Sequence, residues 1–282
     1  FETILVHRGV PFRWNQHLAR LDRGAKRLRI EIPFSPGRLR EFADQLIGKN
    51  RLPESILRIA LSRGVGPRGY STQGADSPTL VMTLHPAPPL PGSADSSAGV
   101  ANTEPHRSHE GERSPVPVAQ PTLQWRLITS SVRVAANDPL APLKTASKLP
   151  QILARLEAEE QGADEALLLN TDGRVAEAAS GNLFWFERET VCTPPLDAGL
   201  LAGVTRSVVL ELCRSLGWRS EEKDIRPARL KRTNGVFLTL STLGIVEVVS
   251  LDGEPLPRSK RIEHLQRAYG QLVAAECGCG RD

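Results

Sequence analysis

The 282-residue sequence predicts an α+β protein that has two domains and largely antiparallel sheets. Three observations support this fold class. Short β-branched runs are paired by turn signals, amphipathic helical runs lie between them, and a polar segment at 87–121 interrupts both patterns. This segment is rich in Pro, Ser, Gly and charge and nearly empty of large apolar side chains, so we expect a flexible linker there. An ordered active-site lid is the alternative.

The first domain is expected at residues 1–86. Alternating β-branched residues predict its strands, and apolar residues at helical spacing predict its helices. In chain order we expect a strand at 1–6, a helix capped by Asn15, a helix at 36–49 that begins at Ser35, and strands at 55–64 and 78–86. A loop rich in Gly and Arg joins the last two strands. The chain opens with Phe1 rather than Met, so we expect the natural N-terminus to lie upstream.

The second domain is expected at residues 122–282. The "TDGR" stretch at 171–174 is a strong signal for a hairpin turn. In chain order we expect a strand at 123–134, a helix at 148–161, hairpin-linked strands over 163–194, a helix at 203–216, strands at 235–241 and 245–250, and a helix at 258–276. The helix at 148–161 carries its apolar residues Ile152, Leu153, Leu156 and Ala158 on one side.

Composition excludes several function classes. The net charge is +4, but the basic residues are scattered and matched by 32 acidic ones, so nucleic-acid binding is not expected. The four cysteines lack the spacing of a metal site, which favours a reduced, cytoplasmic protein without bound metal. No signal peptide and no apolar run long enough to cross a membrane is visible.

Candidate chemistry begins at Lys144, which follows a proline-containing turn and precedes a helix. Glu177 ends a strand of small and apolar residues further along the chain. Gly203 then precedes a helix, and a glycine followed by free backbone N–H groups makes an anion site. A hydroxyl-rich turn, "LSTLG", occupies 240–244. Each feature alone has an ordinary explanation, such as a surface lysine, an exposed strand acid or a common helix start.

Together these features match the needs of pyridoxal 5'-phosphate. A lysine amine reacts with the aldehyde of this cofactor, a carboxylate pairs with the pyridine nitrogen so that the ring can accept electrons, and a helix start holds the phosphate. The order of the features in the chain is Lys144, Glu177 and then the helix start after Gly203. We therefore expect an enzyme with this cofactor.

The sequence also resembles the class IV aminotransferase family, which contains branched-chain transaminases, D-amino acid transaminases and 4-amino-4-deoxychorismate lyases. The resemblance covers nearly the whole chain except the linker. It rests on "FET", "HLARL", "SRGVGPRGYST", "LKT", "GADEALLLNTDGRVAEAASGNLFWF", "CTPPLDAGLLAGVTR" and "LSTLG", in this order. It implies a smaller N-terminal α/β sandwich and a larger C-terminal pseudo-barrel with flanking helices. It also implies a homodimer that acts on a small amino substrate.

The resemblance implies the roles of several residues. Lys144 would be the reactive lysine, and the cofactor-binding residues would be Arg20, Lys144, Glu177, Val204, Thr205 and Thr242. From its pattern alone, Arg20 is a helix-surface arginine. The sequence departs from the family after the lysine, because Ser147, Lys148 and Leu149 stand where members often have Asn and Tyr.

The loop "SRGVGPRGYST" indicates the substrate. We expect Arg68 and Tyr70 to bind it, since arginine is a natural partner for the two carboxylates of aminodeoxychorismate. The sequences of this loop, of "NLFW" and of "TPPLDAG" are most similar to the lyase branch of the family. An amino-acid transaminase that uses 2-oxoglutarate is the alternative. A non-catalytic relative that serves as an interaction module is a third hypothesis, supported by the missing Asn and Tyr.

Overall fold

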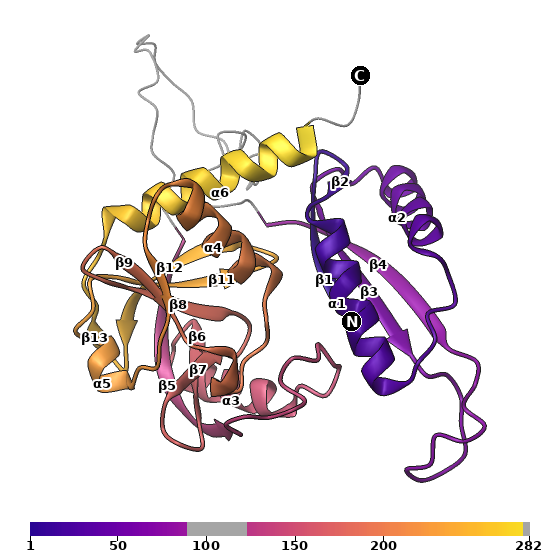
Figure 1. Ribbon diagram of the computed structural model, residues 1–282, viewed down its shortest axis with the longest axis horizontal. Coiled ribbons are helices and arrows are strands. Elements are labelled where there is room, and N and C mark those ends of the chain that lie inside the picture. The colour runs from indigo at the N-terminus through magenta and orange to yellow at the C-terminus, as the bar shows by residue number, and fades with distance from the viewer. Residues whose placement is uncertain (89–122, 279–282) are drawn as a thin grey trace, which may run out of the picture.

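The computed structural model describes residues 1–88 and 123–278 (Figure 1). Most of the expected linker, residues 89–122, lies outside this description. The N-terminal residues form a four-stranded antiparallel sheet in the order β2-β1-β3-β4. Its elements are β1 (Glu2–His7), β2 (Val10–Pro11), α1 (Trp14–Leu28), α2 (Pro36–Asn50), β3 (Ser55–Ser62) and β4 (Thr79–Pro86). The expected strands and helices of this region are therefore present.

The first sheet has one face for its own helices and one face for the rest of the molecule. Side chains alternate along a strand, so Ile4 and Val6 of β1 point to the helix side, where they pack with Leu18 of α1. Leu5 points the other way and joins a cluster with residues of the C-terminal half, such as Phe184. Thr3 lies two residues before Leu5 and therefore projects from the same face of β1. Its side chain points toward the C-terminal half of the molecule.

The N-terminus of α1 corrects one expectation. The helix begins at Trp14 and not after Asn15, and Arg13 is its N-cap residue in the left-handed conformation (φ 54°). The Arg13 guanidinium forms ion pairs with Glu211 (2.8 Å) and Glu276 (2.9 Å), two residues far along the chain. These tertiary contacts hold Arg13 in place, whereas Ser35 caps α2 as expected by accepting from the Arg38 N–H.

The C-terminal residues form a nine-stranded mixed sheet in the order β10-β9-β8-β11-β12-β5-β6-β7, with β13 beside β12. The strands are β5 (Gln124–Val134), β6 (Glu165–Asn170), β7 (Val175–Ala178), β8 (Asn182–Glu187), β9 (Thr190–Thr193), β10 (Ser220–Glu222), β11 (Val236–Leu240), β12 (Gly244–Leu251) and β13 (Glu254–Pro255). The expected hairpin joins β6 and β7 in antiparallel pairing. Strand β5 is parallel to both of its neighbours, β12 and β6. The sheet is therefore mixed, whereas the hairpin signals in the sequence predict mainly antiparallel pairing.

Helices and short turns surround this sheet. They are α3 (Leu149–Glu160), the 3-10 turn η1 (Leu196–Ala198), α4 (Val204–Ser215), α5 (Pro227–Leu230) and α6 (Lys260–Gly278). Helix α6 runs across the top of the molecule from the second sheet to the first (Figure 1). Near its end, the Cys277 thiol donates to the Val10 carbonyl oxygen (3.5 Å). The two sheets are thus held together by a shared apolar cluster and by α6.

Helix α3 turns its larger apolar residues outward. Ile152, Leu153 and Leu156 are 55%, 45% and 48% exposed, while Ala154 and Ala158 are fully buried. The small side chains let the helix backbone lie close to β5 and β6. The apolar side that the sequence indicates is therefore not the packing side.

The cysteines behave as reduced core residues. Cys192, Cys213 and Cys277 are free and buried, and burial raises the pKa of each thiol to about 11. In the described residues, no helix is long and apolar enough to cross a membrane, and no cluster of His, Cys, Asp and Glu could hold a metal ion.

Candidate active site

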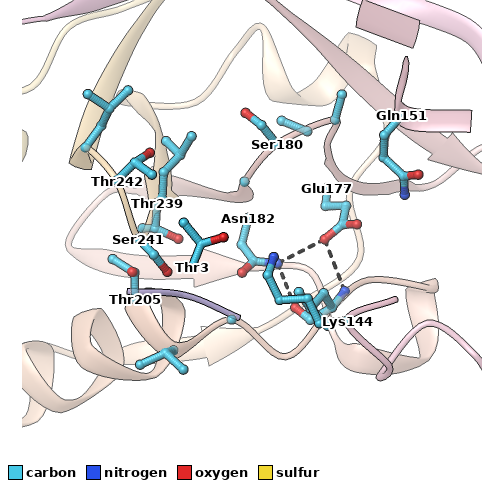
Figure 2. Close-up of a pocket in the computed structure, with 18 of the residues that line it drawn as sticks. Thr3, Lys144, Gln151, Glu177, Ser180, Asn182, Thr205, Thr239, Ser241 and Thr242 are labelled. Atoms are coloured by element: carbon cyan, nitrogen blue, oxygen red, sulfur yellow. Dashed lines mark hydrogen bonds between the residues drawn. The ribbon is translucent and has the colours of Figure 1, made fainter. Parts of the chain in front are cut away.

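A cavity of about 470 Å³ lies between the two sheets, a size typical of small-molecule sites. Strand β1, the turn before α3, strand β7, the start of α4 and the turn after β11 all contribute to its wall. Figure 2 shows two distinct ends. We call Lys144, Lys148 and Glu177 the reactive end, and Thr205, Thr239, Ser241 and Thr242 the hydroxyl end. All of these side chains line the same cavity.

Lys144 belongs to the turn between β5 and α3, where backbone contacts fix its position. Its carbonyl oxygen accepts a hydrogen bond from the Phe1 nitrogen (2.8 Å), and its Nζ lies 4.8 Å from the centroid of the Phe1 ring. Burial lowers the pKa of the Lys144 amine to about 8, and the positive charges of Arg20 and Lys148 act in the same direction. A large fraction of this amine is therefore neutral, and nucleophilic, near pH 8.

Glu177 projects from the edge strand β7 into the cavity. Its Oε2 accepts from the Leu201 backbone N–H (3.1 Å) and from the Asn182 side-chain amide (3.2 Å). Burial raises the pKa of this carboxyl group to about 7, against the Leu201 hydrogen bond and the charges of Lys148 and Lys144. The group is held in a fixed orientation close to the reactive amine, as Figure 2 shows.

The hydroxyl end combines the start of a helix with several hydroxyl side chains. Helix α4 begins after Gly203 without a side-chain cap, so its first backbone N–H groups face the cavity region unsatisfied. The Thr239 hydroxyl is buried and has no hydrogen-bond partner among the described residues. Thr205, Ser241 and Thr242 lie beside it (Figure 2). Uncapped N–H groups at a helix start, together with the unpaired Thr239 hydroxyl, suit a phosphate.

Asn182 connects the two ends. Its amide nitrogen donates to Glu177 and also to the Leu201 carbonyl oxygen (2.8 Å), just before the start of α4. A Cβ placed on Gly203 would lie 2.0 Å from the Asn182 Oδ1. Gly203 is therefore required by this close approach, and the sequence pattern "SGN" gave no hint of the role of Asn182.

Arg20 is buried at the boundary of the two sheets and not on the helix surface. Its guanidinium donates to both carboxylate oxygens of Glu2 (2.9 and 2.6 Å) and to the Ala202 carbonyl oxygen (3.0 Å). His17 contacts the same carboxylate through Nδ1 (2.7 Å). Burial alone would raise the pKa of Glu2, but the Arg20 and His17 hydrogen bonds lower it to about 2. Arg20 still has two N–H groups without partners and lines the cavity.

The structure therefore brings together most of the residues that the sequence indicates. Those that line the cavity are Arg20, Lys144, Glu177, Val204, Thr205 and Thr242. Arg68 and Tyr70 do not line it, because both are exposed in the connection between β3 and β4, with Tyr70 fully exposed. Sequence reasoning missed Thr3 and Thr239, although the alternation of β1 and β11 was a signal for which side each faces.

The cavity fits pyridoxal phosphate on structural grounds. The amine with a lowered pKa suits the aldehyde, the carboxyl group that is held by Leu201 suits the ring nitrogen, and the orphaned hydroxyl of Thr239 beside an uncapped helix suits the phosphate. Lys144 and Glu177 would supply the reactive groups, and the hydroxyl end together with Arg20 would hold the phosphate.

Comparison with known proteins gives consistent results. A model of the amino-transferase class IV family matches residues 1–251. A Methanocaldococcus jannaschii protein named "Putative branched-chain-amino-acid aminotransferase" is 30% identical over 254 residues, which are 90% of this chain and 78% of that protein. The aminodeoxychorismate lyase of Bacillus subtilis is 26% identical, over 89% of this chain and 77% of that protein. The crystal structure of 4-amino-4-deoxychorismate lyase from Pseudomonas aeruginosa matches with a TM-score of 0.74 at 28% identity, covering 98% of this chain and 89% of that one.

Proposed function

The chain belongs to the class IV aminotransferase family of pyridoxal-phosphate enzymes, and we propose that it is a 4-amino-4-deoxychorismate lyase. This enzyme would release pyruvate and 4-aminobenzoate. The relatives bear the names of lyases and of aminotransferases, so the choice depends on how the site suits a substrate. The observation that carries the proposal is the position of Arg58.

Arg58 lines a second cavity of about 140 Å³, which adjoins the first through Phe1, Arg20 and Lys144. It lies directly opposite Thr3 in the pairing of β1 with β3, on the face turned toward the C-terminal half. Its guanidinium lies 4.2 Å from the centroid of the Phe1 ring and makes no ion pair among the described residues. An unpaired guanidinium in such a position suits a carboxylate.

The two cations beside the Phe1 ring support the lyase substrate in this proposal. The Lys144 amine and the Arg58 guanidinium both lie against this ring. An α-amino acid carries its carboxylate on the same carbon as its amine. Aminodeoxychorismate carries its two carboxylates away from the amine-bearing carbon, so one of them can reach Arg58 while the amine is at Lys144.

In this proposal, Lys144 moves the protons of the reaction. The bound cofactor supplies an aldehyde and an electron-accepting ring. With this group bound, the neutral Lys144 amine would take the proton from the amine-bearing carbon of the substrate. The bond between the substrate ring and the oxygen of its side chain then breaks. The ring becomes aromatic, and the Lys144 ammonium returns a proton to the methylene carbon of the leaving group, which becomes pyruvate. Glu177 keeps the ring nitrogen protonated throughout.

The deciding experiment supplies purified protein and pyridoxal phosphate with aminodeoxychorismate, and in parallel with L- and D-amino acids plus 2-oxoglutarate. We expect 4-aminobenzoate to form faster than any transamination product. Efficient transamination with no 4-aminobenzoate above an enzyme-free control would overturn the proposal.

Two arginine variants then locate the carboxylate partner. Arg58→Ala should raise the Michaelis constant for aminodeoxychorismate about tenfold or more, because a charge-assisted hydrogen bond is worth about 1.5–3 kcal/mol. Arg68→Ala, which removes an exposed arginine outside the cavity, is the matched control. A larger effect of Arg68→Ala would instead support the expected role of the β3–β4 loop. That outcome favours a homodimer in which a second copy brings this loop to the site.

An amino-acid aminotransferase is the second candidate. The 30% identity to the archaeal protein with an aminotransferase name favours it. The residues after Lys144 count against a branched-chain specificity, because Ser147, Lys148 and Leu149 stand where members often have an asparagine and a tyrosine. The same substrate panel separates the two candidates.

A further inference from the structure

Lys144, Glu177 and the hydroxyl end would together fix the orientation of a pyridoxal phosphate ring in the cavity. The aldehyde carbon is attached to the ring opposite the nitrogen, so Lys144 and Glu177 mark two opposite points of the ring. The phosphate arm is on one ring carbon next to the aldehyde position, and the phenolic oxygen is on the other. With the phosphate at the hydroxyl end, the phenolic oxygen faces the opposite wall.

The opposite wall is formed by the start of α3. Figure 2 places Gln151 beyond Glu177, on the side away from Thr205 and Thr242. Lys148, Gln151 and Arg155 of this region all line the cavity. Lys148 is the N-cap residue of α3, and its positive charge acts on both Lys144 and Glu177. A ring held between Lys144 and Glu177 would therefore present to Lys148 the edge that joins the aldehyde position to the nitrogen.

Lys148 is the basic residue of this wall that is free to bind a ligand. Arg155 is engaged by Glu159 (3.2 Å) and Glu165 (3.5 Å). The Lys148 side chain makes no ion pair or hydrogen bond among the described residues, and it is partly buried. The Gln151 side-chain oxygen, one helical turn further on, is buried without a partner. A partly buried ammonium with no partner inside a cavity indicates a negatively charged ligand atom.

We propose that Lys148 is a further cofactor-binding residue, whose ammonium group donates to the phenolic oxygen of pyridoxal phosphate and keeps that oxygen ionised. In the holoenzyme we expect the Gln151 side-chain oxygen, which has no partner in this structure, to accept from the same ammonium and orient it. The inference rests on the proposed placement of the cofactor, and it holds for a lyase and for an aminotransferase alike.

The ammonium group also has an effect on Lys144. A positive charge beside the phenolic oxygen opposes a second positive charge on the nitrogen that joins Lys144 to the cofactor. The bound cofactor therefore loses its proton at a lower pH than it would without Lys148. This proton controls the visible absorbance band, so the effect is measured by a pH titration of the holoenzyme.

The first test compares the holoenzyme with Lys148→Met, Lys148→Arg and the control Lys49→Met. Lys49 is an exposed lysine of α2, so its replacement removes the same charge far from the cavity. We expect Lys148→Met to raise the midpoint of the absorbance titration by about one pH unit or more, and Lys148→Arg to restore most of the wild-type midpoint. An unchanged midpoint in Lys148→Met would overturn the proposal.

The second test uses a cofactor analogue that lacks the phenolic oxygen, and it remains informative if Lys148→Met binds the cofactor weakly. We expect Lys148→Met to weaken binding of pyridoxal phosphate about tenfold and to leave binding of the analogue unchanged. An equal loss for both compounds would show that Lys148 has only a structural role and would overturn the proposal. If Lys148→Met weakens binding of pyridoxal phosphate alone and the wild-type enzyme forms no 4-aminobenzoate, the role of Lys148 is supported and the proposed lyase activity is rejected.

Discussion

The two ends of the cavity differ in the charge of their polar side chains and in how these side chains are stabilised without a ligand. The hydroxyl end offers neutral donors, among them the Thr239 hydroxyl, that stay unpaired until a ligand arrives. The reactive end contains charged groups whose pKa values are moved toward neutrality, to about 8 for Lys144 and about 7 for Glu177. An unpaired buried hydroxyl costs about 1–3 kcal/mol, whereas an unpaired buried charge costs far more unless its pKa shifts. Substitutions at the reactive end should therefore have the larger effects.

The largest effect is expected at Lys144. Lys144→Ala should keep the fold but lose the visible band of the covalently bound cofactor and all measurable turnover, because the Lys144 amine both bonds to the cofactor and moves the proton in the proposed reaction. The measurements are an absorbance spectrum after gel filtration and the product assay. Retention of the band in Lys144→Ala would instead indicate that Lys148 forms the covalent bond to the cofactor. The double variant Lys144→Ala/Lys148→Met would then separate the two lysines.

Glu177→Gln should have the second largest effect. An amide of the same shape retains the hydrogen bond from Leu201 but does not keep the ring nitrogen protonated. We expect cofactor to remain bound and the rate to fall by about 2–4 kcal/mol of transition-state stabilisation. Steady-state kinetics at saturating cofactor measure this loss. Wild-type turnover in the variant would contradict the pairing of Glu177 with the ring.

The same variant has a predictable effect on the stability of the cofactor-free protein. Glu177 has a raised pKa in the folded state, so its contribution to stability is present below the ordinary pKa of a glutamate and is lost as the pH rises through about 7. Glu177→Gln removes this loss. We expect the variant to gain about 1–3 kcal/mol relative to wild type between pH 5 and pH 8 in urea unfolding. An equal difference at both pH values would show that the carboxyl group is not desolvated.

The smallest effect is expected at the hydroxyl end. Thr239→Val removes a hydroxyl that has no partner, so the cofactor-free protein should keep its stability while cofactor affinity falls by about 0.5–1.5 kcal/mol. Thr233→Val is the matched control, because the Thr233 hydroxyl is equally buried but donates to the Leu230 carbonyl oxygen (2.8 Å). That control should lose stability and keep affinity. Loss of stability in Thr239→Val without loss of affinity would assign Thr239 to the core.

Much of the fold was predictable because its signals are local. The hairpin at 171–174 depends on an Asp-Gly turn and its flanking strands, and the start of α2 depends on Ser35. The face of α3 was not predictable in this way. Its burial depends on how closely β5 and β6 approach, which favours Ala154 and Ala158 over the larger residues nearby.

The sequence by itself determined which reactive side chains are available and in which order, because Lys144, Glu177 and the glycine before α4 are recognisable from their types and positions. Tertiary structure decided which charges face the cavity. Arg20 has the pattern of a surface residue, yet its guanidinium bridges Glu2 and Ala202, which is 182 positions away in the chain. Arg58 likewise shares a cavity wall with Lys144 only because the N-terminal and C-terminal halves of the chain pack together. Local rules act over a few residues, whereas the burial and pairing of a charge depend on every segment that packs around it.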